Sequence, residues 1–552
     1  MIKASGTQTR KLSLAALVTI ALSLVSAAQS VAPAGTFRIA GTLVSKSDGH
    51  HLPNARITLR NVKNPQKADS VITGDDGRFE FTGLAAGKYS ITGAKRGFIT
   101  ASYDQHELFS TAIVTGAGVD TENLTMKLAP DAVISGKILD EVGDPIRRAN
   151  VTLYIEDRGE GFDRIRAFRN TQTDDLGAYE FTPLAPGTFF LSATAKPWYA
   201  FHPRPENTEA GATPPTPAAM ADRSLDVAYP LTYYPDTSDV DGAAPILIRG
   251  GERLQFDLHL NPVPALRILF HVPTDAKNGY GQMMPRLEQP AFDGMTGVNV
   301  EYSQPAPGVW ELTGIPAGRY DVHLQGGAIS SQISGVDLSK DEELVDATKA
   351  EALSNVKIKA QIPGETSIPS GLIIGLRVKN KQLSGWKELD AKGETELESI
   401  PAGKYEIVAW GRGKLYSIAR VAAEGAQVSG HAVEIAAGSS PSLSVTVAVG
   451  TVEVEGTAKR AGKGFAGAMI VLVPSDTQED RDFRRDQSDL DGTFSLRGVV
   501  PGAYKIVAIE DGWDLDWSQP EVIAAYAKHS KMIEIGNGPH KNLADAVEVQ
   551  KK

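Results

Sequence analysis

The sequence predicts an all-β protein, a tandem array of about five β-sandwiches behind an N-terminal export signal. Three observations predict this class. One turn–strand–turn–strand pattern recurs five times, glycine and proline occur 54 and 32 times among 552 residues, and long amphipathic helical patterns are missing. Short strands joined by many turns require this much glycine and proline. A chain of this length is too long for one core, so several domains are expected.

The clearest copy of the repeat runs from Asp75 to Tyr89 and reads D-D-G-R-F-E-F-T-G-L-A-A-G-K-Y. Its start favours a turn, because glycine accepts a positive φ and aspartate bonds its own backbone. Phe79 and Phe81 then alternate with polar residues, which is the period of a half-buried strand. A second turn at Ala86-Gly87 leads into the next strand, so each copy predicts a β-hairpin. In every copy two glycines stand ten residues apart: Gly77 and Gly87, Gly177 and Gly187, Gly308 and Gly318, Gly393 and Gly403, and Gly492 and Gly502.

The spacing of the copies sets the predicted domains. Their first glycines lie 85 to 131 residues apart, the size of an ordinary β-sandwich. The third and fourth copies are divergent, since Pro307 replaces the aspartate of one and Thr395 replaces the first aromatic residue of the other. Short linkers favour limited flexibility, but they leave open whether the units form a rod or fold back. The predicted sandwiches span residues 36–130, 131–264, 265–361, 362–449 and 450–552, with a Pro- and aromatic-rich insertion at 196–250 that contains a loop at 203–221.

Residues 1–28 have the pattern of a secretory signal peptide. A start with three cations precedes an apolar run from Leu12 to Val25, and Ser26-Ala27-Ala28 offers small residues for cleavage. No other apolar run is long enough to span a bilayer, so we expect no transmembrane segment after cleavage. The absence of cysteine excludes disulfides, thiolate metal sites and lipoprotein anchoring. These features indicate an exported bacterial protein of the periplasm, cell surface or extracellular space.

The charge balance restricts the class of partner. The formal net charge is −11, and removal of the signal would make the chain more acidic. Because no basic stripe is present to neutralise phosphates, nucleic acid is not an expected partner. A polysaccharide or an envelope protein is the expected kind of partner.

The second copy carries a resemblance to a known family. Gly143 to Leu153 reads G-D-P-I-R-R-A-N-V-T-L, and Thr173 to Phe189 reads T-D-D-L-G-A-Y-E-F-T-P-L-A-P-G-T-F. This combination resembles the carboxypeptidase regulatory-like domain, a transthyretin-like (prealbumin-like, Ig-like) sandwich with carbohydrate-binding-like relatives. The first, second and fifth copies carry both halves of the pattern, whereas the third and fourth carry only the hairpin half. The resemblance implies the fold and no catalytic residue, because that domain is itself non-catalytic.

No catalytic residue, metal ligand or cofactor is assigned from the sequence. His431-Ala432-Val433-Glu434 matches the H-x-x-E of zinc carboxypeptidases, but an alternating strand pattern puts His431 and Glu434 on opposite faces. A catalytic zinc also needs a third ligand and a closed pocket. The chain holds no G-x-S-x-G elbow and no phosphate-binding glycine loop. Two aspartate clusters are interpreted as solvated turns rather than calcium sites: Asp236, Asp239 and Asp241, and Asp486, Asp489 and Asp491.

Aromatic residues are the candidate ligand-binding residues. Flat aromatic faces stack on sugars, and loops on rigid sandwiches often carry specificity. The alternative is that these rings cover their own core. The sequence favours a non-enzymatic envelope binding or scaffolding protein, with a carbohydrate-binding protein and an accessory module of a secreted hydrolase as alternatives. The candidate residues are Trp198, Tyr199, Tyr233 and Tyr234 in the insertion, with Trp513 and Trp517 on a later loop.

Overall fold

The computed structural model describes residues 35–159, 161–202, 223–273, 283–325, 330–378, 383–411, 415–475, 483–528, 530–536 and 538–552. This part of the chain is almost entirely β-strand, which confirms the all-β class. The expected signal peptide at 1–28 and the expected loop at 203–221 lie outside the described residues. The described helices are α1 (Pro520–Ala527) and the short 3-10 helices η2 (Arg223–Leu225), η3 (Val240–Gly242), η4 (Ala347–Lys349) and η5 (Gly512–Asp514).

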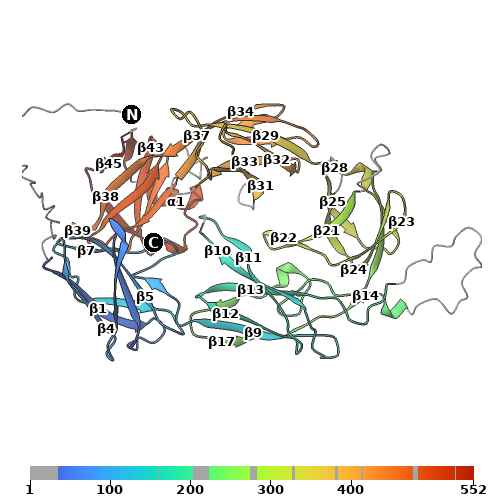
Figure 1. Cartoon of the computed structure of the whole chain (residues 1–552), viewed down its shortest axis with the longest axis horizontal. Helices are drawn as coiled ribbons and strands as arrows, with labels where there is room; N and C mark the ends of the chain where they lie inside the picture. The colour runs from blue at the N-terminus through green and yellow to red at the C-terminus, as the bar shows by residue number, and fades with distance from the viewer. Residues whose placement is uncertain are drawn as a thin grey trace, which may run out of the picture.

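Sandwich 1 consists of two sheets that enclose one hydrophobic core (Figure 1). One sheet has the strand order β4-β1-β8, and the other has the order β3-β2-β5-β6, with β7 also on β5. The period-2 alternation holds, because Phe79 and Phe81 are both buried in this core. The strands are β1 (Phe37–Ser45), β2 (Arg56–Asn61), β3 (Asn64–Ile72), β4 (Arg78–Leu84), β5 (Gly87–Ala94), β6 (Ala101–Ser102), β7 (Ile113–Thr115) and β8 (Leu124–Leu128).

Sandwich 2 repeats this plan with sheets β12-β9-β17 and β11-β10-β13-β15. The described part of the predicted insertion returns to the second sheet, since β15 and β16 both pair with β13. A two-stranded ribbon, β14 with β19, lies at the edge. The strands are β9 (Ala132–Leu139), β10 (Asn150–Asp157), β11 (Arg164–Gln172), β12 (Ala178–Leu184), β13 (Gly187–Thr194), β14 (Val227–Ala228), β15 (Thr232–Tyr233), β16 (Ile246–Ile248), β17 (Arg253–Gln255), β18 (Leu258–His259) and β19 (Val263–Pro264).

Sandwiches 3 and 4 each place one core between a four-stranded and a five-stranded sheet. Sandwich 3 comprises β20 (Leu266–His271), β21 (Met284–Ala291), β22 (Gly294–Gly297), β23 (Glu301–Ala306), β24 (Val309–Ile315), β25 (Gly318–Gln325), β26 (Ser331–Leu338), β27 (Glu343–Asp346) and β28 (Glu351–Ala352). Sandwich 4 comprises β29 (Ser354–Gln361), β30 (Ile373–Arg377), β31 (Leu383–Glu388), β32 (Glu394–Ile400), β33 (Gly403–Trp410), β34 (Leu415–Glu424), β35 (Gln427–Ser429), β36 (Ala432–Ile435) and β37 (Ser442–Gly450).

Sandwich 5 differs because its layers are joined at one edge. Strand β46 pairs in parallel with both β38 and β43, which links nine strands into one sheet. Helix α1 packs outside β40 and β43 and encloses a second apolar cluster that includes Met469, Ile509 and Ile523. The strands are β38 (Val452–Arg460), β39 (Lys463–Gly464), β40 (Met469–Pro474), β41 (Arg484–Gln487), β42 (Thr493–Val499), β43 (Gly502–Glu510), β44 (Met532–Ile535), β45 (His540–Asn542) and β46 (Val547–Lys551).

The repeated pattern has the same physical basis in all five sandwiches. The first glycine of each copy has a φ between +70° and +84°, which only glycine adopts without strain. The second glycine begins a strand, and the aromatic ring two residues later lies over it, for example Tyr320 over Gly318. In four copies the tyrosine hydroxyl donates to the carbonyl four residues earlier; the donors are Tyr89, Tyr320, Tyr405 and Tyr504.

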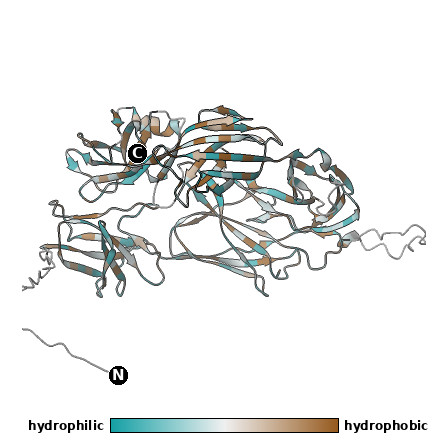
Figure 2. Cartoon of the chain, turned by 45° about the horizontal axis from the view of Figure 1, so that its top comes forward, coloured by the Kyte–Doolittle hydropathy of each residue, from teal (hydrophilic) through white to brown (hydrophobic). Residues whose placement is uncertain are grey.

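The sandwiches are not arranged as a rod. Figure 1 shows the chain folding back, so that sandwich 5 (red) lies against sandwich 1 (blue), and Figure 2 shows hydrophobic and hydrophilic residues alternating along the strands. Segments 401 residues apart are hydrogen-bonded in the pair Lys88–Asp489. Two interfaces between sandwiches are candidates for a functional role. One lies between the consecutive sandwiches 2 and 3, and the other, formed by the fold-back, joins sandwich 5 to sandwiches 1 and 2.

Candidate functional site

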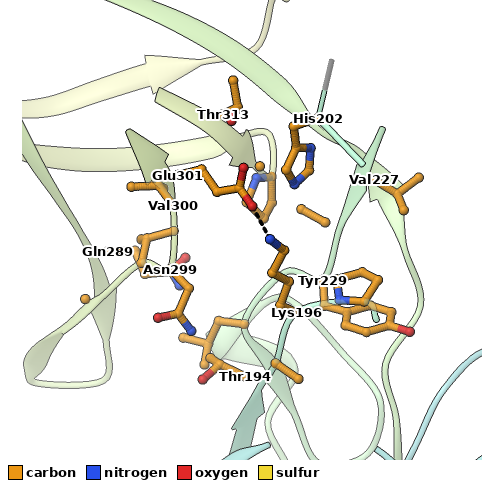
Figure 3. Close-up of a pocket in the computed structure, with 18 of the residues that line it drawn as sticks. Thr194, Lys196, His202, Val227, Tyr229, Gln289, Asn299, Val300, Glu301 and Thr313 are labelled. Atoms are coloured by element: carbon orange, nitrogen blue, oxygen red, sulfur yellow. Dashed lines mark hydrogen bonds and ion pairs between the residues drawn. The ribbon is translucent and has the colours of Figure 1, made fainter. Parts of the chain in front are cut away.

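A pocket with a volume of about 460 Å³ lies between sandwiches 2 and 3 (Figure 3). Sandwich 2 contributes the end of β13, the segment that follows it up to His202, and β14. Sandwich 3 contributes the segment between β22 and β23 and the end of β24. Ligand pockets occur preferentially at such domain interfaces and in this range of volume. The described part of the predicted insertion therefore lines a pocket, although with other residues than those expected. We call it the 2–3 pocket.

An ion pair crosses the 2–3 pocket. The Lys196 ammonium of sandwich 2 binds the Glu301 carboxylate of sandwich 3, and Figure 3 shows this pair in the middle of the lining residues. Above it, the buried His202 imidazole is hydrogen-bonded through Nδ1 to Asp226 at 2.7 Å. A side chain at Gly314, where φ is +79°, would place its Cβ 2.8 Å from His202 Nε2. The imidazole and this glycine thus fix how closely the two sandwiches approach.

One wall of the 2–3 pocket is an oriented tyrosine. The Tyr229 hydroxyl donates to Glu141 Oε2 at 2.9 Å, and the Tyr199 hydroxyl donates to the other oxygen of the same carboxylate. Burial, reinforced by the Glu141 charge, raises the pKa of Tyr229, so the hydroxyl stays protonated. Figure 3 shows Gln289 and Asn299 on the opposite side of the Lys196–Glu301 pair from Tyr229.

Of the sequence-predicted aromatic residues, Trp198 alone is largely exposed. Its side chain is 87 % exposed and stands edge-on to Tyr199, with ring centroids 5.8 Å apart. Tyr233 is 1 % exposed and packs against Phe292 of sandwich 3 at 5.2 Å. Tyr234 packs against Phe256 at 4.7 Å, inside its own sandwich. Protein therefore covers the Tyr233 ring, whereas the half-buried Tyr234 ring packs against the core of sandwich 2.

The two later tryptophans lie where sandwich 5 meets sandwich 1. Trp513 stacks on His106, with centroids 5.0 Å apart and planes 5° apart. Trp517 is buried, and the Arg485 guanidinium carbon lies 4.1 Å from its ring centroid. The structure therefore separates Trp513 and Trp517 from the insertion: Trp513 stacks across the interface, whereas Trp517 packs inside sandwich 5 beneath Arg485.

Arg485 connects three sandwiches at this interface. Its guanidinium donates to both carboxylate oxygens of Glu107 in sandwich 1, at 3.1 and 2.6 Å, and to the Gly159 carbonyl of sandwich 2 at 3.3 Å. Its side chain is only 5 % exposed. A bidentate arginine–carboxylate pair is strong and directional, and removing one partner would leave a buried charge.

Neighbouring residues of sandwich 5 extend the same contact. The Gln487 amide donates to the Asp104 carbonyl at 2.5 Å and to the Thr111 hydroxyl at 2.8 Å. Asp489 accepts from the Ala112 backbone N–H at 3.0 Å and pairs with Lys88 at 2.6 Å. We call the contacts made by Arg485, Gln487, Asp489 and Trp513 the closure interface. The interpretation of Asp486 and Asp489 as solvated turn carboxylates is therefore wrong: Asp489 is buried in the closure interface, and burial also desolvates Asp486 beside it.

A larger pocket of about 1130 Å³ adjoins the closure interface, with lining residues from sandwiches 1, 2, 4 and 5. Six of its charged lining residues pair with one another. Arg485 binds Glu107, Lys88 binds Asp489, and Arg166 binds Asp157 at 2.6 Å. The 2–3 pocket also contains a paired lysine and glutamate, but the side-chain amides of its Gln289 and Asn299 make no hydrogen bond within the described residues, so it is the better candidate for a ligand.

The other aspartates and the H-x-x-E motif, for which the sequence analysis did not favour a metal site, also have defined positions in the structure. Asp239 caps η3, and Asp236 accepts from the His259 backbone N–H. Glu434 on β36 is exposed, whereas its neighbours Val433 and Ile435 are buried. Within the described ranges no three His, Asp or Glu side chains are grouped to hold a metal ion. Over the same ranges, none of the helices has the length and apolar character needed to cross a bilayer.

One exposed aromatic pair was missed by the sequence analysis. Trp386 on β31 is 60 % exposed and lies 6.5 Å, centroid to centroid, from Trp410 on β33. The strand between them contributes Gly375, which pairs directly with Trp386. The signal that could have identified the pair is a tryptophan at an outward-facing position of a short strand pattern.

Comparison with solved structures gives remote likenesses. The Bacillus anthracis TIE protein is 10% identical and covers 75% of this chain and 74% of its own, with a TM-score of 0.18. The Streptococcal ancillary pilin is 13% identical, covers 52% and 98%, and has a TM-score of 0.19. Shaft pilin SpaA from Lactobacillus rhamnosus GG is 10% identical, covers 41% and 98%, and has a TM-score of 0.18. Scores this low carry no argument about function. No curated protein sequence matches the chain.

Two segments match protein-family models. Residues 447–533 match the second β-sandwich domain of BOS complex subunit NOMO1-like proteins. Residues 38–128 match the carboxypeptidase regulatory-like domain. These matches fall on the first and last copies of the repeat and confirm the resemblance on which the fold was predicted.

Proposed function

We propose that the chain is a non-enzymatic binding scaffold, exported to the periplasm, cell surface or exterior of a bacterium. The closure interface carries this proposal. A row of polar and charged groups in sandwich 5 is matched by partners in sandwiches 1 and 2, more than 300 residues away in sequence. Such a contact holds the sandwiches, and the pocket and loops between them, in one fixed relation.

The proposal also fits the surroundings of the carboxylates Asp486 and Asp489. Burial raises the pKa of Asp486 to about 6 and also raises the pKa of Asp489. Shifted carboxylates are common in active sites, but structural networks shift them too. Here Asp489 is bound by Lys88 and Ala112, and Asp486 accepts from the Ser495 N–H at 2.7 Å. A partner in the envelope, a protein or a polymer, would bind the surfaces that this scaffold holds in place.

Small-angle X-ray scattering on the protein without residues 1–28 tests the scaffold. We expect a radius of gyration close to the ~24 Å of a compact chain of this length, because the sandwiches are folded back. Five units in line would give a far larger value. A radius of gyration well above this value, or a scattering profile typical of domains on flexible linkers, would overturn the proposal of a closed scaffold.

A further inference from the structure

The 2–3 pocket offers hydrogen-bonding groups of mixed character. The Glu301 carboxylate only accepts, the Lys196 ammonium only donates, and the amides of Gln289 and Asn299 do both. Within the described residues, the side-chain amides of Gln289 and Asn299 make no hydrogen bond to the protein, so both are available to a ligand. Hydroxyl groups are the ligand groups that satisfy such a set, because each hydroxyl both donates and accepts.

The same pocket has apolar walls. Tyr229, Leu231, Val298 and Val300 line it beside the polar groups, and Glu141 fixes the orientation of the Tyr229 ring. A pyranose ring has a matching division, with an apolar C–H face and an edge of hydroxyls. Predominantly apolar walls with a few convergent polar groups are the usual composition of a specific small-molecule site.

Size and charge narrow the ligand class. The volume of about 460 Å³ accommodates about two sugar rings. The opposite charges of Lys196 and Glu301 bind each other, and His202 is held by Asp226, so the pocket attracts neither an anion nor a cation strongly. We propose that the 2–3 pocket binds a neutral saccharide of about two sugar units. This inference rests on the proposed binding role and adds the ligand class and the residues.

Two other places could hold a sugar by aromatic stacking alone. Trp198 lies just outside the 2–3 pocket, and the Trp386–Trp410 pair lies on sandwich 4. Both lack the enclosed set of donors and acceptors found around Gln289 and Asn299. They therefore provide matched comparison variants, since each change removes an exposed ring and leaves the pocket intact.

The test is isothermal titration calorimetry with maltose, cellobiose and N,N′-diacetylchitobiose, each to millimolar concentration, and with the zwitterionic dipeptide Ala-Ala. We expect at least one disaccharide to bind. Asn299→Ala and Gln289→Ala should each weaken that binding about ten-fold or more, whereas Trp198→Ala and Trp386→Ala should leave it within two-fold. Asn299 is exposed and Gln289 half-buried, so unfolding temperatures should stay at the parent value and exclude misfolding as the cause.

Three results would overturn the inference. Silence of all three disaccharides would reject the saccharide class. Loss of binding in Trp386→Ala with normal binding in Asn299→Ala would move the site to sandwich 4. Binding of Ala-Ala alone would assign the pocket to a zwitterionic peptide, competing for Lys196 and Glu301. None of these results alters the scattering profile, so the failure of this inference and of the scaffold proposal remain distinguishable.

Discussion

Asp486 is a buried carboxylate beside the closure interface, and its protonation couples pH to stability. Burial is the main cause that raises its pKa to about 6, and the nearby Asp489 charge adds to it. A carboxyl group whose pKa is higher in the folded state than its ordinary 3.8 adds stability at low pH. That contribution is lost as the pH rises through about 6. The full effect of a shift of this size is about 2–3 kcal/mol.

Asp486→Asn should therefore stabilise the chain more at pH 7.5 than at pH 5. The amide keeps the shape and can still accept from the Ser495 N–H, but it carries no charge to bury. Differential scanning calorimetry at the two pH values measures the effect. Asp545→Asn, at an exposed carboxylate, is the control and should show no such difference. Equal shifts of Asp486→Asn at both pH values would contradict the interpretation.

The tyrosine hydroxyl of the repeat makes a separate contribution to the free energy of unfolding. Tyr320 is buried and donates to the Pro316 carbonyl at 2.5 Å, closing the second turn of its copy. Tyr320→Phe should lower the free energy of unfolding by about 1–2 kcal/mol, because the buried carbonyl loses its partner. Tyr526→Phe on α1 removes the hydroxyl of a half-buried tyrosine outside the repeat and should cost less. Urea denaturation compares the two variants, and equal losses would show that the turn does not depend on this bond.

The β-hairpin of the repeat also serves as a docking element. The glycine before its last apolar residue takes a positive φ in three copies, at Gly83, Gly314 and Gly498. A Cβ at Gly314 would meet His202 of sandwich 2, and a Cβ at Gly498 would meet Leu415 of sandwich 4 at 2.5 Å. The same position of the hairpin thus accepts a side chain of the preceding sandwich. One sequence pattern specifies both the turn and the contact between units.

Gly314→Ala tests this docking role. The change adds left-handed backbone strain of about 1–2 kcal/mol and a clash with His202. Gly364→Ala is matched, since Gly364 also has a positive φ, +85°, but a Cβ there meets nothing within 4 Å. Calorimetry should show the larger loss for Gly314→Ala, together with faster hydrogen exchange in residues 194–202. Identical losses would show that strain alone acts at Gly314.

The hairpin pattern made the fold predictable from the sequence, but it did not predict the interfaces between sandwiches. Turn glycines such as Gly77 and alternating residues such as Phe79 act on neighbours along the chain, so their physics is visible in the sequence. The partners of Gln487 and Trp513 are Asp104 and His106, which no local pattern connects to them. For the same reason the sequence indicated a site in the insertion through its tryptophan and tyrosines, but could not show which rings protein would cover. It also could not show that Asn299 of another sandwich faces Lys196 across a pocket.

Sandwiches that are neighbours in sequence stay linked by the chain itself. The contact between sandwich 5 and sandwich 1 should therefore depend on the few residues of the closure interface. Glu107 is the sensitive point on the sandwich 1 side. It lies on an exposed loop, yet it neutralises Arg485, whose buried charge has no second carboxylate within bonding distance in the described part of the chain. Leaving such a charge unpaired typically costs about 3–5 kcal/mol. Separation of sandwich 5 from sandwich 1 would return the guanidinium to water and relieve that cost.

Glu107→Gln should therefore open the molecule without unfolding any sandwich. The chain has no cysteine, so spin labels can be placed at Asn64→Cys in sandwich 1 and Lys541→Cys in sandwich 5, both exposed positions. Electron–electron double resonance should give one narrow distance distribution in the parent and a broad, longer one in Glu107→Gln. Glu122→Gln, which removes an exposed partner of Arg38 in the same sandwich, should leave the distribution narrow. A narrow distribution in Glu107→Gln would mean that the hydrogen bonds of Gln487 and Asp489 close the molecule without help from the charge pair.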